Sequence, residues 1–184
     1  MTTPRTPASG PPHIILVGLP GAGKSTVGAL IAERLRARFV DIDLEIERRE
    51  RMSVSDIFST RGEAAFRVME RLITESLASQ PGTIISAGGG WMGDDATVSL
   101  LRPPARIIHL KVKVSTALTR LGPEVSRRPL LAGPAVESRF KALAAARMPL
   151  YSRADAEIET ENLTPQQVAD FGLRLASTWG WPIG

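Results

Sequence analysis

Gly18-Leu-Pro-Gly-Ala-Gly-Lys-Ser-Thr26 carries the strongest structural signal in this 184-residue chain. It is a complete phosphate-binding loop of the pattern G-x-x-x-x-G-K-[ST], and it follows the apolar run His13-Ile-Ile-Leu-Val17, which is typical of a buried parallel strand. After the loop, Val27, Leu30 and Ile31 recur at helical spacing. A chance glycine-rich turn would not be flanked by both elements in register. The sequence therefore predicts a strand, a phosphate loop and a helix, in that order.

The phosphate loop and the helix start together predict a site for the phosphates of a nucleotide. Backbone N–H groups of residues 21–26 would point at the β-phosphate, and the positive end of the helix dipole would add to their effect. The Lys24 side chain would reach the β- and γ-phosphates, and the Ser25 hydroxyl would bind Mg²⁺. We expect ATP with Mg²⁺ to contact Gly21, Ala22, Gly23, Lys24, Ser25 and Thr26.

The composition favours a single soluble domain. No apolar run approaches the ~18 residues of a membrane span, and the first residues lack the apolar centre of a signal peptide. The absence of cysteine excludes disulfides and thiolate metal sites. The net charge of +4 comes from basic residues interleaved with acidic ones, as in residues 47–51, which is typical of solvated helix surface. We expect a cytoplasmic protein with no nucleic-acid or membrane partner.

The chain alternates short apolar runs with helical patterns. The expected strands are residues 13–17, 39–41, 83–86, 106–112 and 156–159. The expected helices are residues 24–36, 44–50, 53–59, 63–79, 94–101, 114–121, 135–148 and 164–177. This alternation predicts an α/β fold in three layers, with a central parallel five-stranded sheet and ligands at the carboxyl ends of its strands. We expect a disordered leader at 1–12, a single domain at 13–178 and a tail at 179–184.

Two insertions interrupt the alternation. Residues 44–79 carry three helical segments between the second and third strands, more than a crossover needs, and we interpret them as a helical substrate-binding insertion. Residues 122–134 have little periodicity and place Arg127 and Arg128 between glycines and prolines, which favours a mobile lid. An ordinary surface loop is the alternative for that segment.

Asp41 and Asp43 end the second expected strand, and strand alternation would put both side chains on the same side, near the phosphate loop. One carboxylate can hold a water molecule of Mg²⁺, while the other can accept a hydrogen bond from a substrate hydroxyl and aim it at the γ-phosphate. No acidic residue ends the third strand, so we assign the metal role to Asp41. The alternative is a polar strand end that caps the next helix.

Three separated arginines indicate a second, negatively charged substrate. Arg67 lies beside the apolar side of its expected helix, and Glu70, three residues later, can orient its guanidinium for a carboxylate. Such a pair alone is more often a surface salt bridge. Arg128 and Arg147 supply two further cations. Gly88-Gly89-Gly90, after the third strand, would let the backbone approach a ligand, although a tight turn would use the same residues.

In order and spacing, these motifs resemble the shikimate kinases, a family of P-loop small-molecule kinases. The resemblance covers residues 14–175 and includes Asp41-x-Asp43, Glu63-x-x-Phe-Arg67-x-x-Glu70, Arg128-Pro-Leu-Leu and Arg147-x-Pro-Leu-Tyr. It implies a cytoplasmic monomer that transfers the γ-phosphoryl group of ATP to the 3-hydroxyl of shikimate. Trp91-Met92 departs from the small residues that the family usually has there.

The resemblance also implies roles for single residues. Shikimate is expected at Asp43, Arg67, Gly88, Gly89, Gly90 and Arg147. Mg²⁺ is expected at Ser25 and Asp41, and ATP at the phosphate loop, Arg128 and, near the adenine, Arg120. Lys24, Asp43 and Arg128 form the expected catalytic set. The alternatives are a related kinase such as a gluconate kinase, against which the Arg67 and Arg147 motifs argue, and a ligand-sensing domain of the same fold without turnover.

Overall fold

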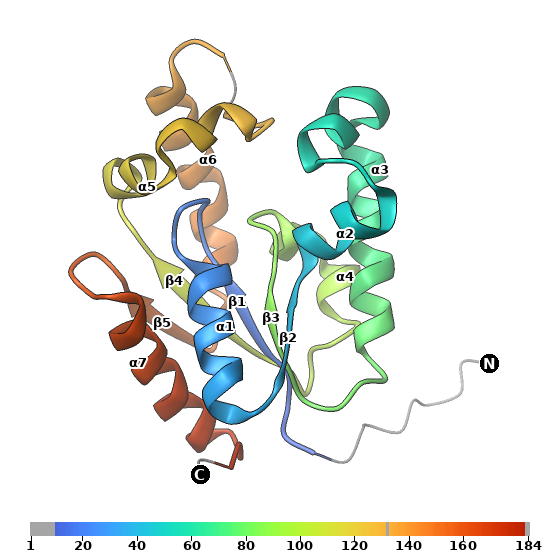
Figure 1. The fold of residues 1–184 in the computed structure, drawn as a ribbon, viewed down its shortest axis with the longest axis vertical. Helices are drawn as coiled ribbons and strands as arrows, with labels where there is room; N and C mark the ends of the chain where they lie inside the picture. The colour runs from blue at the N-terminus through green and yellow to red at the C-terminus, as the bar shows by residue number, and fades with distance from the viewer. Residues whose placement is uncertain (1–9, 132, 183–184) are drawn as a thin grey trace.

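Five parallel strands form the centre of the computed structural model, which describes residues 10–131 and 133–182. They are β1 (Ile14–Val17), β2 (Arg38–Asp41), β3 (Thr83–Ser86), β4 (Arg106–Lys111) and β5 (Ala156–Glu159), in the sheet order β2-β3-β1-β4-β5 (Figure 1). Every residue of β1 and β3 is buried, as expected for inner strands covered on both faces. The prediction of a five-stranded parallel sheet is confirmed.

Helices cover both faces of this sheet. On one face, α1 (Lys24–Leu35) and α7 (Pro165–Thr178) pack side by side (Figure 1). On the other face lie α3 (Val54–Leu77), α4 (Asp95–Val98) and α6 (Val136–Tyr151). The remaining elements are α2 (Ile42–Glu50), α5 (Val114–Leu121) and the 3₁₀ turns η1 (Trp91–Gly93) and η2 (Gly122–Arg127). Among the described residues, no helix combines the length and apolar character that crossing a membrane requires.

The junction between β2 and α2 differs from the prediction. Strand β2 ends at Asp41, whose Oδ1 accepts a hydrogen bond from the Leu44 N–H at 3.2 Å and so caps α2. Helix α2 therefore starts at Ile42, and Asp43 lies in its first turn. The expectation that strand alternation places Asp43 was wrong, because the cap at Asp41 ends the strand two residues earlier. The alternative prediction, that the end of this strand caps the next helix, is confirmed for Asp41, whose Oδ1 makes the capping contact.

The expected substrate-binding insertion is built from α2 and α3. Ser53 caps α3 by accepting a hydrogen bond from the Asp56 N–H at 3.0 Å. Gly62 interrupts α3 with φ 80°, a conformation that glycine adopts readily, and so separates the two predicted segments 53–59 and 63–79. The predicted helix 94–101 is shorter in the structure, where α4 ends at Val98 before the chain reaches two prolines that cannot continue a helix.

Segments near the two ends of the chain meet at the amino ends of the strands. The Trp181 side chain is buried, and its Nε1 donates a hydrogen bond to the Pro12 carbonyl oxygen at 2.9 Å. Pro11 lies against Gly82, directly before β3. These residues, expected in the leader and the tail, thus pack on the domain. The rest of those two predicted segments, residues 1–9 and 183–184, lies outside the described residues, as does Ala132 in the expected lid.

Candidate active site

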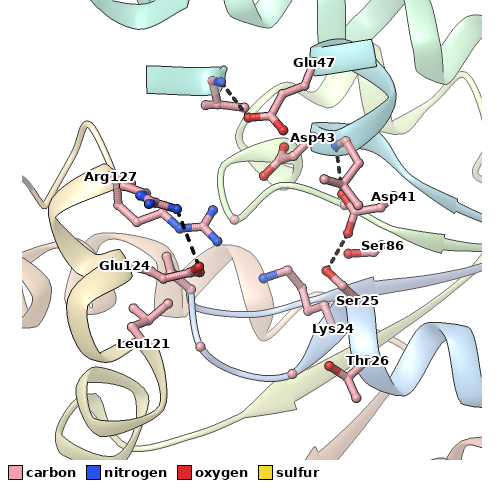
Figure 2. Close-up of a pocket in the computed structure, with 18 of the residues that line it drawn as sticks. Lys24, Ser25, Thr26, Asp41, Asp43, Glu47, Ser86, Leu121, Glu124 and Arg127 are labelled. Atoms are coloured by element: carbon pink, nitrogen blue, oxygen red, sulfur yellow. Dashed lines mark hydrogen bonds and ion pairs between the residues drawn. The ribbon is translucent and has the colours of Figure 1, made fainter. Parts of the chain in front are cut away.

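A cavity of about 750 Å³ opens at the carboxyl ends of the strands (Figure 2). One wall comes from α2 and the start of α3, and the opposite wall comes from the end of α5 and from η2. This large cavity brings together many predicted site residues, namely Gly21, Gly23, Lys24, Ser25, Thr26, Asp41, Asp43, Gly89 and Arg128. Ala22, in the same phosphate loop, is buried and does not line the cavity.

Lys24 folds over the phosphate loop at the start of α1. Its ammonium donates hydrogen bonds to the Gly18 and Leu19 carbonyl oxygens at 3.1 and 3.2 Å. Gly23, with φ 94°, supplies the left-handed conformation that leads into the helix. Burial lowers the pKa of Lys24 to about 8, while the nearby charge of Asp43 opposes this shift. The side chain is therefore mainly cationic at neutral pH and can stabilise phosphate charge.

Ser25 and Asp41 meet on the floor of the large cavity (Figure 2). The Ser25 hydroxyl donates to Asp41 Oδ2 at 2.5 Å, whereas Oδ1 caps α2. The sheet register pairs Asp41 with Ser86, whose side chain lines the same cavity. Hydroxyl and carboxylate oxygens are the ligands that Mg²⁺ prefers in proteins, so the two residues predicted for the metal fit such an ion.

Asp43 reaches the site from the first turn of α2. Its Oδ1 and Glu70 Oε1 are the two buried side-chain oxygens that lack a hydrogen-bond partner among the described residues. Both face Gly88, since a Cβ added there would lie 3.0 Å from Asp43 Oδ1 and 2.7 Å from Glu70 Oε1. Burial and then the charge of Asp41 raise the pKa of Asp43, and burial raises the pKa of Glu70. A carboxylate with a raised pKa is a stronger acceptor for the proton of a hydroxyl.

A small cavity of about 70 Å³ adjoins the large one. Its charged lining residues are Asp43, Arg67, Arg128 and Arg147, and Phe58 belongs to its apolar wall. The residues that line both cavities are Pro20, Asp43, Val54, Gly89 and Arg128. The two cavities therefore meet at one acid and one arginine from the predicted catalytic set.

The three glycines after β3 make room for charged side chains. A Cβ on Gly89 would press on the Arg147 guanidinium, and a Cβ on Gly90 would press on the Arg67 guanidinium. A Cβ on Gly88 would likewise press on the carboxylates of Asp43 and Glu70. The sequence led us to expect a ligand near this backbone. The structure adds that Gly89 and Gly90, which have no side chains, leave the space that the Arg147 and Arg67 guanidinium groups occupy on the wall of the small cavity.

Two carboxylates hold Arg67. Its Nη1 donates to Glu70 Oε2 at 2.8 Å, while Nε and Nη2 donate to Glu63 Oε1 at 3.2 and 2.7 Å. The Glu70 side chain is 3% exposed and the Glu63 side chain 51%. The prediction that Glu70 orients Arg67 is confirmed, and the pairing is partly buried rather than an ordinary surface salt bridge. Glu63 has a contact that the sequence reasoning missed, although its spacing of four residues from Arg67 on a helix was the available signal.

Arg147 and Arg128 offer positive charge to the cavities. Arg147 is buried, and no ion pair among the described residues involves it or Arg128. A buried guanidinium without a carboxylate is costly unless an anion compensates it. The small cavity is therefore suited to an anionic ligand.

Arg120 lies outside both cavities. Its guanidinium donates to the Thr160 hydroxyl at 3.1 Å and to the Thr160 carbonyl oxygen at 2.7 Å, so it braces the segment after β5. Leu121 lines the large cavity instead, because successive residues of a helix point about 100° apart. The contact of Arg120 with adenine stays a prediction.

Arg127, which our site set omitted, lines the large cavity from η2 (Figure 2).

Trp91, the main departure from the resemblance, does not line either cavity. Its indole is fully buried, and Nε1 donates to the Thr74 hydroxyl of α3 at 3.0 Å. This residue therefore supports α3 from the core. Ser86 is a further residue that the sequence reasoning missed, and it lines the large cavity. Its signal was its position at the end of the strand next to the one that carries Asp41.

Comparisons with known proteins identify the family of this chain. The model of the family described as shikimate kinase matches residues 20–175. A shikimate kinase of Thermobifida fusca is 41% identical over 161 residues, which cover 86% of this chain and 91% of the relative, and one of Xanthomonas oryzae pv. oryzae is 39% identical over 170 residues, which cover 91% and 94%. The solved structure of a shikimate kinase from Acinetobacter baumannii in complex with shikimate has a TM-score of 0.87 at 32% identity, covering 95% of this chain and 97% of that one. The chain belongs to the shikimate kinase family of ATP-dependent phosphotransferases.

Proposed function

We propose that this chain transfers the γ-phosphoryl group of ATP to the 3-hydroxyl of shikimate, giving shikimate 3-phosphate and ADP on the route to chorismate and the aromatic amino acids. The observation that carries this proposal is that Asp43 and Arg128 line both cavities. Phosphates at the phosphate loop and an acceptor in the small cavity would meet at these two side chains. The shikimate bound to the relative from Acinetobacter baumannii supports the choice of acceptor.

The charged side chains of the two cavities would have different roles in the reaction. Arg67 and Arg147 would bind the carboxylate of shikimate from the wall of the small cavity. Asp43 would accept a hydrogen bond from the attacking hydroxyl and aim it at the γ-phosphate. Lys24 and Arg128 would stabilise the negative charge on the transferring group.

Ser25 and Asp41 are the residues that would hold Mg²⁺. When bound, the ion would neutralise charge on the β- and γ-phosphates. The Ser25 hydroxyl would bind it directly, and Asp41, which lies 2.5 Å from that hydroxyl, would hold one of its water molecules.

In addition, we infer a cytoplasmic monomer in which residues 122–134 close over the nucleotide as a lid.

A coupled assay of ADP release with shikimate, gluconate and quinate in parallel tests the proposal. We expect shikimate to give a kcat/KM at least about 10²-fold above the other two acceptors, because a site that hydrogen-bonds its substrate rejects analogues with misplaced groups. Equal use of gluconate would indicate the related kinase. ADP release that no acceptor stimulates, in a protein that still binds shikimate, would indicate a ligand-sensing domain.

Arg67→Ala should weaken acceptor binding selectively. The loss of one charge-assisted fork to a carboxylate costs about 2 kcal/mol, which corresponds to a roughly 30-fold lower kcat/KM for shikimate, with the KM for ATP nearly unchanged. Arg71→Ala is the matched control, since Arg71 lies one turn further along α3, half exposed and 4.0 Å from Asp94. Equal increases in both KM values would mean that Arg67 only holds the helix in place.

Gly90→Ala should also damage the acceptor site. The new Cβ would displace the Arg67 guanidinium, so we expect the KM for shikimate to rise at least about 10-fold, without a comparable change for ATP. Gly93→Ala is the control, because its Cβ would meet only Leu150 Cδ1, at an ordinary 3.8 Å. Wild-type kinetics for Gly90→Ala would contradict the proposed role of the third glycine.

A further inference from the structure

Tyr151 connects the point where the two cavities meet to the core of the fold. Its hydroxyl donates a hydrogen bond to the Gly89 carbonyl oxygen at 2.8 Å, and its side chain is buried. Gly89 lines both cavities and is the glycine against which the Arg147 guanidinium packs. Tyr151 itself lines neither cavity. It can therefore act on the site only through its neighbours.

The Tyr151 hydroxyl also lies beside Arg147. The two residues are four positions apart on α6 and so share one face of the helix. Burial raises the pKa of Tyr151 to about 12, and the adjacent charge of Arg147 opposes that shift. The hydroxyl thus keeps its proton at physiological pH and remains a donor to Gly89. Arg147 has no ion-pair partner in the described part of the chain, and its guanidinium lies against Gly89 and within hydrogen-bonding reach of the Tyr151 hydroxyl.

His109 of β4 supports the tyrosine ring from the sheet. The two ring centroids are 4.7 Å apart with planes at 29°, and the imidazole is buried. His109 Nδ1 lies 3.1 Å from Glu157 Oε2 of the neighbouring strand β5. This ring contact and the burial of the side chain hold the Tyr151 ring in place, with its hydroxyl beside the Gly89 carbonyl oxygen.

We propose that Tyr151 is a positioning residue for the acceptor, which holds the Gly89 peptide and the Arg147 guanidinium in the arrangement that receives the acceptor's carboxylate. This inference deepens the proposed function and rests on it for the identity of the acceptor. Contacts to a carboxylate remote from the reacting hydroxyl act equally in the ground state and the transition state. Loss of the positioning contact should therefore change affinity for the acceptor and leave kcat largely unchanged.

Tyr151→Phe tests this role, because phenylalanine keeps the ring on His109 and removes only the hydroxyl, with its contacts to Gly89 and Arg147. We expect the KM for shikimate to rise roughly 5- to 10-fold, with kcat and the KM for ATP within about 2-fold of wild type. The dissociation constant of shikimate, measured by calorimetry without nucleotide, should rise by the same factor. Thr83→Val is the matched control, since the buried Thr83 hydroxyl also donates to a backbone carbonyl at 2.8 Å, at the opposite end of β3. It should leave every one of these constants unchanged.

The methyl ester of shikimate separates positioning from general support of the fold. The ester has no negative charge for Arg147, so Tyr151→Phe should change its dissociation constant by less than about 2-fold. Equal weakening of both ligands, or an unchanged dissociation constant for shikimate, would overturn the proposal. Melting curves would confirm that both variants are folded at the temperature of the measurement. Absence of ADP formation by the wild-type enzyme would contradict only the proposed function, because calorimetry reports on Tyr151 without turnover.

Discussion

Asp43→Asn is expected to lower kcat by about 10²-fold or more, with changes of less than about 3-fold in either KM. Asparagine keeps the size of the side chain and most of its hydrogen-bonding geometry, but it removes the negative charge. Asp43 lines both cavities, and burial raises its pKa, so its carboxylate is well placed to receive the proton of the attacking hydroxyl. Steady-state kinetics with shikimate and ATP as the varied substrates measure the effect.

Asp41→Asn is the matched comparison, since it makes the same chemical change two residues away. Because Asp41 contacts Ser25 rather than the small cavity, we expect a raised Mg²⁺ requirement that high Mg²⁺ partly rescues. A Mg²⁺ titration of both variants separates the two roles. Rescue of Asp43→Asn but not of Asp41→Asn would reverse our assignment. Near-wild-type kcat in both variants would exclude a catalytic role for the junction between β2 and α2.

Lys24→Met is expected to lower kcat/KM for ATP by about 10³-fold. Methionine preserves the length and the apolar stem of the side chain, so the phosphate loop should keep its packing. The lost ammonium is the charge that would move from the Gly18 and Leu19 carbonyl oxygens to the phosphates. Initial rates over a range of ATP concentrations, at saturating shikimate and Mg²⁺, give the value.

Lys111→Met is the control for the lysine substitution. Lys111 is 43% exposed on β4 and pairs with Glu157 and Glu159, away from both cavities. Its loss should leave kcat and both KM values within about 2-fold of wild type, because exposed ion pairs contribute little. A Lys24→Met enzyme that kept more than a tenth of the wild-type kcat/KM would show that the phosphate loop works through its backbone alone.

Local patterns explain why the sheet and the phosphate half of the site could be predicted. Residues 13–26 form a strand, a loop and a helix start within one continuous segment, so adjacent residues carry the whole signal. Asp43 shows the limit of such patterns. The spacing of Asp41 and Asp43 fits both a continuing strand and the start of a helix. The hydrogen bond from the Leu44 N–H to Asp41 decides for the helix start, and the sequence pattern does not reveal that bond.

The acceptor half depends on contacts between distant segments. Gly90 accommodates Arg67 from α3, and Gly89 accommodates Arg147 from α6, yet nothing in the run of glycines names those partners. The hydrogen bond from Tyr151 to Gly89 spans 62 positions in the sequence. The sequence was equally uninformative about Arg120. Neighbouring residues on a helix point about 100° apart, so Arg120 contacts Thr160 while Leu121 faces the large cavity.

The hydrogen bond between Trp181 and Pro12 has a practical consequence for binding measurements. It fastens both ends of the domain at the amino ends of the strands, whereas the two cavities open at the carboxyl ends. An anchor attached through either end would leave the cavities facing the solution. The enzyme is thus suited to oriented immobilisation on a sensor chip, where nucleotide and acceptor can be added separately and in either order.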